Sequence, residues 1–351
     1  MISKIAISSS CICYQDNGIW FVHAGFPLLF HYNLKEDEFD LIKVIPNEPL
    51  DKNFLFRGIY ANNKLVILIP CNSCRIIIYK KFEDAFECIN IVDYCENMFR
   101  GIIKKEKWLY LIPYNYCRIV RLDLDKLSIT YCQPWKGILE KEKVISSASG
   151  RGNKIYFTIW NTNRIYVYNC KTGESEILEV LGMDAISNVV VINEYMYIYN
   201  MSDRTLKKYD TDSNKIVKDV FVGARDVWLY RNQNSIVLSF VEDNIIKIYD
   251  LDLNEKITER EEKKKLVWKN EISCIQWTSN KNVVYGIDSE NNLISLEDDL
   301  VRKKEIFLDT NLIKKLGNDI AVYSEEKLFR EVPIFDIENY INYMLKNKNI
   351  I

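Results

Sequence analysis

Residues 99–123 read FRGIIKKEKWLYLIPYNYCRIVRLD, and much of this stretch recurs 43 residues earlier in the chain. Residues 56–80 read FRGIYANNKLVILIPCNSCRIIIYK, with the same opening FRGI, an apolar run that ends in proline, and a turn followed by CRI. Repetition at a fixed interval is the mark of repeat architectures. The sequence therefore predicts a chain built from copies of one unit.

The unit recurs along most of the chain, and its third apolar run ends in a characteristic way. A Tyr or Leu closes this run, and a polar residue follows it. The seven endings are Tyr32-Asn33, Tyr79-Lys80, Leu122-Asp123, Tyr168-Asn169, Tyr209-Asp210, Tyr249-Asp250 and Leu296-Glu297, which lie 40 to 47 residues apart. This interval is typical of a unit of four β-strands.

Turn chemistry supports short antiparallel strands within each unit. Asp16-Asn17-Gly18, Asn62-Asn63-Lys64 and Gly152-Asn153-Lys154 each precede an apolar run. Asn and Gly tolerate the positive φ that tight hairpins require. Because no helical pattern separates the runs, the units are predicted to be antiparallel meanders and not βαβ crossovers.

The pattern resembles the β-propeller repeat superfamily, which includes the WD40, kelch, NHL and YVTN types. The resemblance covers residues 1–332 and rests on repeat period and strand order, because the sharper signatures of single branches are absent. It implies an all-β fold, a single β-propeller of four-stranded antiparallel blades around a central channel. It also implies that ligands or partners bind at the face where the fourth-to-first and second-to-third strand loops gather.

The number of blades depends on the two ends of the repeat region. Residues 310–332 look like an eighth unit without a fourth strand, whereas residues 2–7 supply a strand to spare before the first unit. If these ends pair, they close the ring and leave no open edge. We therefore predict eight blades closed by the N-terminal strand; seven blades with an appended hairpin is the alternative.

The tail, residues 333–351, differs from the repeats. Asp336 can cap a short helix over residues 336–345 whose apolar residues share one face. This helix either packs against its own propeller or docks onto another protein, such as an enzyme of which the chain is a subunit.

Composition limits the classes of function. The chain has 47 basic and 49 acidic residues, a net charge of −2, which argues against a nucleic-acid footprint. The N-terminus lacks the pattern of a signal peptide, and no run approaches 18 consecutive apolar residues, so neither export nor a membrane span is expected. We expect a cytoplasmic protein whose ten cysteines are reduced.

Aligning the units places one residue of each near the start of its innermost strand, at the channel mouth. All are arginine or small hydroxyl or amide residues: Ser10, Arg57, Arg100, Ser147, Ser187, Arg225, Ser273, and Thr310 or Asn311. Because arginine donates in a planar fork suited to carboxylate or phosphate, the three arginines predict an anionic ligand. Alternatively, these polar side chains tie neighbouring blades together through backbone carbonyls.

The second-to-third strand turns lie on the same predicted face. They add amide, aromatic and imidazole side chains to the candidate ligand-binding residues: His23, Tyr114, Asn115, Trp160 and Asn161. Such groups beside arginines suit a sugar, a nucleotide or a peptide.

Metal and redox chemistry have little support in the sequence. Cys71 and Cys74 form a C-x-x-C pair on an ordinary hairpin, but zinc needs two further ligands and no second C-x-x-C exists. We expect no metal and no cofactor.

The sequence favours an intracellular binding or scaffolding protein that engages a protein partner or an anionic small molecule at the arginine-lined mouth, without nucleic acid or membrane. The alternative is a lyase or hydrolase acting on an anionic sugar or peptide in the same funnel. Its only imidazole base near the mouth is His23, and catalytic residues are not identified.

Overall fold

The structure is a computed structural model of the 351-residue chain. It describes residues 5–6, 9–25, 27–49, 52–132, 145–225, 227–232, 234–240, 246–256, 277–280, 283–287, 292–297 and 300–308. In these residues every regular element is a β-strand. No helix in the described ranges is long and apolar enough to cross a membrane.

The described strands form seven four-stranded antiparallel sheets, each made of consecutive strands. The first two sheets contain β2 (Ser9–Gln15), β3 (Gly18–His23), β4 (Leu28–Asn33) and β5 (Glu38–Val44), then β6 (Phe56–Ala61), β7 (Leu65–Pro70), β8 (Arg75–Lys80) and β9 (Ala85–Asn90). The third and fourth contain β10 (Phe99–Lys105), β11 (Trp108–Pro113), β12 (Ile119–Asp123) and β13 (Ser128–Cys132), then β14 (Ile145–Arg151), β15 (Lys154–Ile159), β16 (Arg164–Asn169) and β17 (Ser175–Glu179). The fifth and sixth contain β18 (Ile186–Ile192), β19 (Tyr195–Asn200), β20 (Thr205–Asp210) and β21 (Lys215–Phe221), then β22 (Val227–Asn232), β23 (Ser235–Phe240), β24 (Ile246–Asp250) and β25 (Glu255–Lys256). The seventh contains β26 (Trp277–Asn280), β27 (Val283–Ile287), β28 (Asn292–Glu297) and β29 (Leu300–Glu305). The predicted meander of four strands is confirmed.

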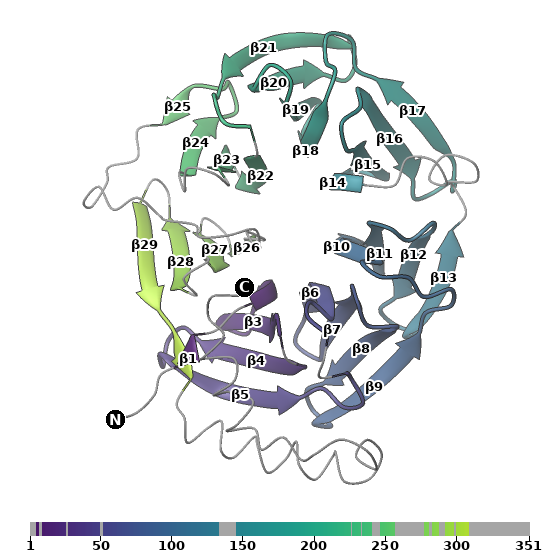
Figure 1. Ribbon diagram of the computed structural model, residues 1–351, viewed down its shortest axis with the longest axis vertical. Coiled ribbons are helices and arrows are strands. Elements are labelled where there is room, and N and C mark those ends of the chain that lie inside the picture. Colours follow the sequence, from purple (N-terminus) through teal and green to yellow (C-terminus); the bar gives the residue numbers. More distant parts are fainter. Residues whose placement is uncertain are drawn as a thin grey trace.

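The sheets stand radially around a common centre, with the first strand of each sheet innermost and the fourth outermost (Figure 1). The core lies between neighbouring sheets. One apolar cluster joins the first and second sheets, and similar clusters join the following pairs up to the fifth and sixth. A middle strand therefore has apolar neighbours on both faces, which is why β7 and β11 are buried almost end to end.

The repeated Tyr-Asp and Tyr-Asn endings have a local cause. The hydroxyl of Tyr79 donates to Asp84 at 2.6 Å and that of Tyr209 to Asn214 at 3.3 Å, five residues on in each case, and Tyr32 bonds Asp37 in the same way. Each acceptor has a positive φ in the hairpin loop. The adjacent polar residue caps the same loop, because its side-chain oxygen accepts backbone N–H groups at Asn33, Asp123, Asn169, Asp210 and Asp250. The sequence repeat is thus a repeat of third-to-fourth strand hairpins.

The seventh sheet packs directly on the first. Leu293 and Ile306 share an apolar cluster with Phe21 and other residues of the first sheet. Strand β1 (Ile5–Ala6) pairs with β30 (Phe307–Leu308), which follows β29. The N-terminal strand was predicted to pair with residues 310–332; those residues and the predicted helix over 336–345 lie outside the described part of the chain.

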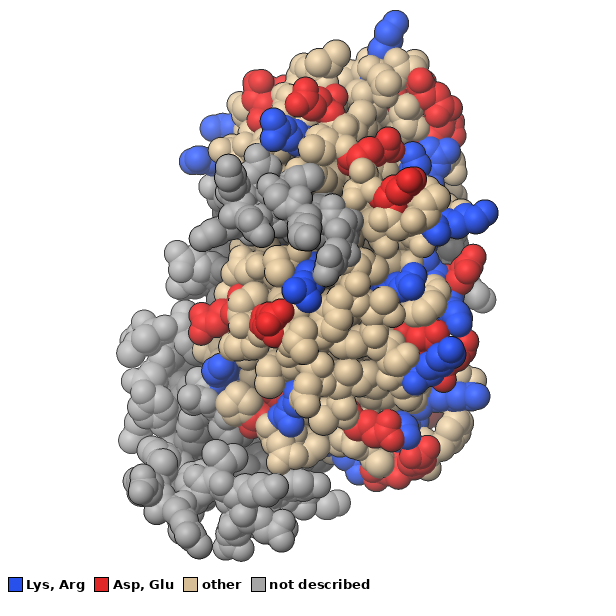
Figure 2. Space-filling model, turned by 90° about the vertical axis from the view of Figure 1, so that its right-hand side faces the viewer, with Lys and Arg blue, Asp and Glu red and all other residues tan. Residues whose placement is uncertain are grey.

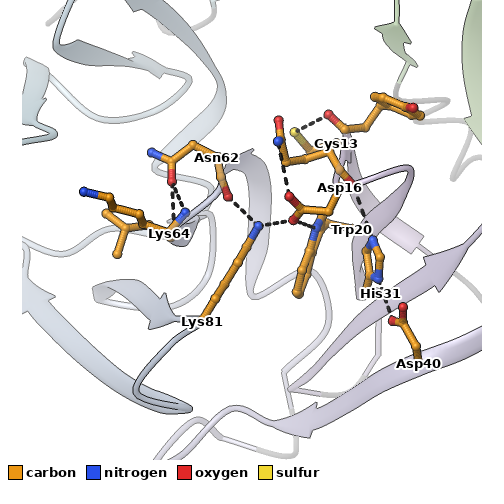
Figure 3. A network of polar contacts seen from close by, with 11 residues as sticks. Cys13, Asp16, Trp20, His31, Asp40, Asn62, Lys64 and Lys81 are labelled. Atoms are coloured by element: carbon orange, nitrogen blue, oxygen red, sulfur yellow. Dashed lines mark hydrogen bonds and ion pairs between the residues drawn. The ribbon is translucent and has the colours of Figure 1, made fainter.

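A network of polar contacts joins the first sheet to the second sheet (Figure 3). The Nζ of Lys81 bonds the Asp16 carboxylate and the Asn62 carbonyl, and it lies 4.6 Å from the centre of the Trp20 ring. The Trp20 Nε1–H donates to the same carboxylate at 3.2 Å. These bonds hold the pKa of Asp16 below its usual value although its burial acts in the opposite direction. The predicted hairpin at Asp16 is therefore also an inter-sheet contact.

Candidate functional site

The innermost strands of the first five sheets share one irregularity near their starts. In each, the first residue of the inner strand pairs with the second strand, the next residue has no pairing partner, and pairing resumes one residue later. Such an extra residue is a β-bulge. The bulged residues are Ser10, Arg57, Arg100, Ser146 and Ser187. Four of these are the residues predicted to ring the channel mouth, and in the fourth sheet the bulge falls at Ser146, one residue before Ser147. Bulges re-aim side chains, so this repeated feature positions the ring.

The serine side of the ring joins neighbouring sheets. The Ser147 hydroxyl bonds the backbone of Val189 at 3.4 Å, and Val191 N–H donates to Ser149 Oγ at 2.9 Å. Thr158 donates to the Ser187 carbonyl at 3.3 Å, and Asn188 Nδ2 donates to the Val227 carbonyl at 2.7 Å. Of the residues predicted to ring the mouth, Ser147 therefore joins two sheets through its own side chain, whereas the ties at Ser187 and Val227 come from the side chains of Thr158 and Asn188.

The arginine side of the ring is built differently, from stacked aromatic rings. The guanidinium of Arg57 lies 5.0 Å from the centre of the Phe54 ring. That of Arg100 lies 5.3 Å from the centre of the Tyr114 ring and 4.4 Å from the centre of the Trp228 ring. Cation–π contacts at these distances are favourable.

The Arg100–Trp228 contact reaches across the centre of the ring of sheets. Arg100 is on β10 of the third sheet and Trp228 is on β22 of the sixth, and these strands face each other over the centre in Figure 1. Because the two side chains meet at 4.4 Å, they span the channel near the starts of the inner strands. The channel mouth therefore contains a guanidinium held between aromatic rings from two distant sheets.

Arg225 does not occupy the position equivalent to Arg57 and Arg100. In the second, third and sixth sheets the first pairs are Phe56 with Pro70, Phe99 with Pro113 and Val227 with Phe240. Trp228 follows Val227 as the arginines follow their phenylalanines, whereas Arg225 is exposed in the linker before β22. Arg225 lies two residues before β22, and the described ladder of the sixth sheet has no bulged residue to match Arg57 and Arg100.

His23 ends β3 and is almost completely buried. Its Nδ1 accepts the backbone N–H of Gly25 at 3.0 Å, and burial lowers the pKa of His23 to about 4. A neutral ring that accepts at Nδ1 carries its proton on Nε2. His23 is therefore poorly suited to the role of general base that the enzyme alternative requires.

The remaining predicted residues lie in the second-to-third strand turns and are more exposed. Asn115 donates from Nδ2 to the Glu96 carbonyl at 3.1 Å, which ties its turn to the preceding linker. Trp160 is 46% exposed, and Asn161 has a φ of 60°, as its turn requires. Of this group, contacts join only Tyr114 to an arginine of the mouth among the described residues.

The described cysteines are free thiols, and Cys71 of the C-x-x-C pair is buried while Cys74 is exposed. Cys71 Sγ lies 3.5 Å from Asn97 Oδ1. Within the described ranges no group of three or more His, Cys, Asp and Glu side chains is placed to hold a metal ion.

Two aromatic partners of the arginines, Phe54 and Trp228, were not among the predicted site residues. Phe54 has a φ of 52° in the linker before β6, and Trp228 comes from a sheet three units away from Arg100. Val227 and Phe240 form the first described pair of the sixth sheet, and Trp228 is the next residue of its strand. Aligning the sixth unit on this pair would have identified Trp228.

The sequence matches no protein-family model and no curated protein. Solved structures, in contrast, resemble it over most of its length, at identities that establish the fold alone. Virginiamycin B lyase from Staphylococcus aureus superposes with a TM-score of 0.61 at 11% identity, over 87% of this chain and 99% of that one. PorZ, a surface component of the type-IX secretion system of Porphyromonas gingivalis, gives 0.61 at 12% identity over 87% of this chain, which spans 39% of PorZ. A chain of the mitotic checkpoint complex gives 0.59 at 9% identity, over 87% of this chain and 89% of that one. With its radial four-stranded sheets, the protein has the β-propeller fold.

Proposed function

We propose that this β-propeller is a binding module that engages an anionic ligand, either a small molecule or an acidic segment of a protein partner, at the channel mouth around Arg57 and Arg100. The observation that carries the proposal is the placement of the Arg100 guanidinium against Tyr114 and Trp228, across the centre of the ring. Two aromatic rings at cation–π distance hold this guanidinium in place at the mouth. A planar fork held in this way suits carboxylate or phosphate.

Preorganisation supports affinity at this place. A long arginine side chain ordinarily loses rotamer freedom when it binds an anion, and a guanidinium already fixed by two rings loses less. On the serine side, the Ser147 hydroxyl donates to the Val189 carbonyl and the Ser187 hydroxyl accepts from Asn188 Nδ2, so we assign ligand recognition to the arginine side. The enzyme alternative has less support, because the imidazole of His23 is buried, neutral and already an acceptor.

Calorimetry with a panel of anions, including phosphate, sulfate and a sugar acid, tests this function. Arg100→Ala is expected to weaken binding by roughly 1.5–3 kcal/mol, the usual size for a hydrogen bond to a charged group. Arg164→Ala, which removes an arginine on β16 that pairs with Glu179, is the control and should bind normally. Binding that survives the loss of both Arg57 and Arg100 contradicts the proposal.

We also propose that the propeller closes with seven blades, the alternative in the sequence prediction. The Tyr14 ring of the first sheet stacks on the Tyr285 ring of the seventh, with centres 5.4 Å apart and planes 8° apart. An eighth blade between these sheets would separate the two rings.

A double-mutant cycle with Tyr14→Leu and Tyr285→Leu tests the closure. We expect a coupling energy of roughly 0.5–1.5 kcal/mol in chemical denaturation, as for other aromatic pairs. Additive effects of the two substitutions would favour eight blades.

The cytoplasmic location is likewise a proposal. It is supported by the free thiols of the described cysteines, since a reducing compartment keeps thiols unpaired. In Figure 2, basic and acidic side chains alternate over the side of the ring in view, which fits the proposal that nucleic acid is not a partner.

A further inference from the structure

The opposite end of the inner strands holds an open cavity of about 540 Å³. Its lining comes from Gly150, Arg151 and Gly152 at the end of β14, from Val191, Asn193 and Glu194 at the end of β18 and the turn after it, and from Arg231 near the end of β22. Arg57 and Arg100 lie near the starts of their strands, and the start of β10 meets the start of β22. The cavity is therefore at the other end of the ring from the proposed mouth.

Two arginines from two sheets line this cavity, and a lysine from a third sheet lies beside one of its lining glycines. Arg151 is positioned by Thr211, because its Nη1 donates to Thr211 Oγ1 at 3.3 Å and that hydroxyl donates to the Glu194 carbonyl at 2.8 Å. Arg231 is exposed in the lining. Lys105, at the end of β10, lies beside the turn, since its Nζ is 2.8 Å from where a Cβ on Gly150 would stand.

The charges of these cations are not balanced by carboxylates of the described residues. In the part of the chain that the structure describes, no ion pair involves Lys105, Arg151 or Arg231, and Glu194 is the one carboxylate in the lining. Burial lowers the pKa of Lys105, as expected for an amine without a carboxylate partner. The buried lysines of β20 are arranged differently, with Lys207 2.7 Å from Asp203 and Lys208 2.8 Å from Asp252.

We propose that this cavity is a second binding site, specific for a small phosphate-bearing polyanion of the diphosphate class. Arginine forks match phosphate oxygens, and the volume lies in the range of ligand sites. Gly152, with a φ of +49°, keeps the turn free of a side chain beside the arginines. No aromatic ring is in the lining, so a nucleobase would find no stacking partner. The phosphate groups themselves are the recognised element.

Isothermal titration calorimetry of the full chain with inorganic pyrophosphate tests the site. Arg151→Gln and Arg231→Gln should each weaken binding roughly tenfold or more. Glu194→Gln should strengthen it severalfold, since it removes the carboxylate that repels the ligand. Arg164→Gln, which removes an arginine outside both sites, should leave the affinity for pyrophosphate unchanged. In Arg100→Ala any binding at the channel mouth is weakened, and the pyrophosphate binding that remains should still be lost on adding Arg231→Gln.

Three results would overturn the inference. Wild-type protein that does not bind pyrophosphate at millimolar concentration has no such site. Pyrophosphate binding that is lost in Arg100→Ala and kept in Arg231→Gln belongs to the mouth. Citrate that binds as tightly as pyrophosphate shows that the site selects charge and not phosphate. Because the sites have different arginines, failure here leaves the proposed function at the mouth standing.

Discussion

Arg75→Met is expected to lower the free energy of unfolding by roughly 3–5 kcal/mol near neutral pH. The side chain of Glu48, in the linker between the first and second sheets, is 1% exposed, and its carboxylate lies 2.8 Å from Arg75 Nη2. Arg75 Nε donates to the same oxygen at 3.2 Å. Without the guanidinium, a buried carboxylate is left without its charge partner, which costs far more than the loss of a surface pair.

The effect should depend on pH with a defined sign. Burial raises the pKa of Glu48 above its ordinary value, although Arg75 acts to lower it. A carboxyl with a raised folded-state pKa contributes stability that is present below the unfolded pKa and is lost as pH rises through the folded pKa. Since Met removes the opposing influence, the deficit of Arg75→Met should shrink as pH falls towards about 4.

Urea denaturation of the wild type and of the single and double variants decides the matter. Arg75→Met/Glu48→Gln should recover most of the lost stability near neutral pH, because no buried charge remains. A deficit of Arg75→Met that is the same at neutral and acid pH would show that packing, and not the charge of Glu48, accounts for the loss.

Phe21→Ala is expected to destabilise the protein by roughly 3–5 kcal/mol. Phe21 is fully buried on β3, stacks on Phe30 at 5.0 Å and meets the edge of Phe39 at 5.9 Å. Its apolar cluster also contains Leu293 of β28 and Ile306, which follows β29. The cavity would therefore open at the interface between the first and seventh sheets. The substitution is therefore expected to weaken the packing between the first and seventh sheets.

Phe82→Ala provides the matched control, because Phe82 is 81% exposed and its truncation should change stability by less than about 0.5 kcal/mol. Phe21→Leu, which leaves a smaller cavity, should fall between the two and remains measurable if the alanine variant does not fold. Equal denaturation midpoints for Phe21→Leu and wild type would mean that this interface does not hold the ring together.

The sequence predicted the strands and their meander order because the signals for them are local. Asp210 accepts the backbone N–H groups two and three residues on, and Tyr209 bonds Asn214 five residues on, so the same few residue types recur wherever the hairpin recurs. The sequence also predicted that Arg57, Arg100 and Ser187 lie near the starts of their inner strands. This signal is local too, because each follows an apolar residue that opens the strand. Arg225 precedes β22 by two residues, and the described ladder of that sheet has no bulge, so the sequence alignment gave no register for it.

The sequence by itself determined the four-stranded unit, its repetition and the residues that open each inner strand, because these depend on hydrogen bonds between neighbours in the chain. Only the tertiary structure decided that Arg100 meets Trp228 and that Tyr14 stacks on Tyr285. It also decided that Arg151 and Arg231 line one cavity. These pairs come from different sheets and are far apart in sequence, so their distances are set by the way the sheets pack around the centre. The repeat period specifies each sheet and carries no information on which side chains meet across the ring.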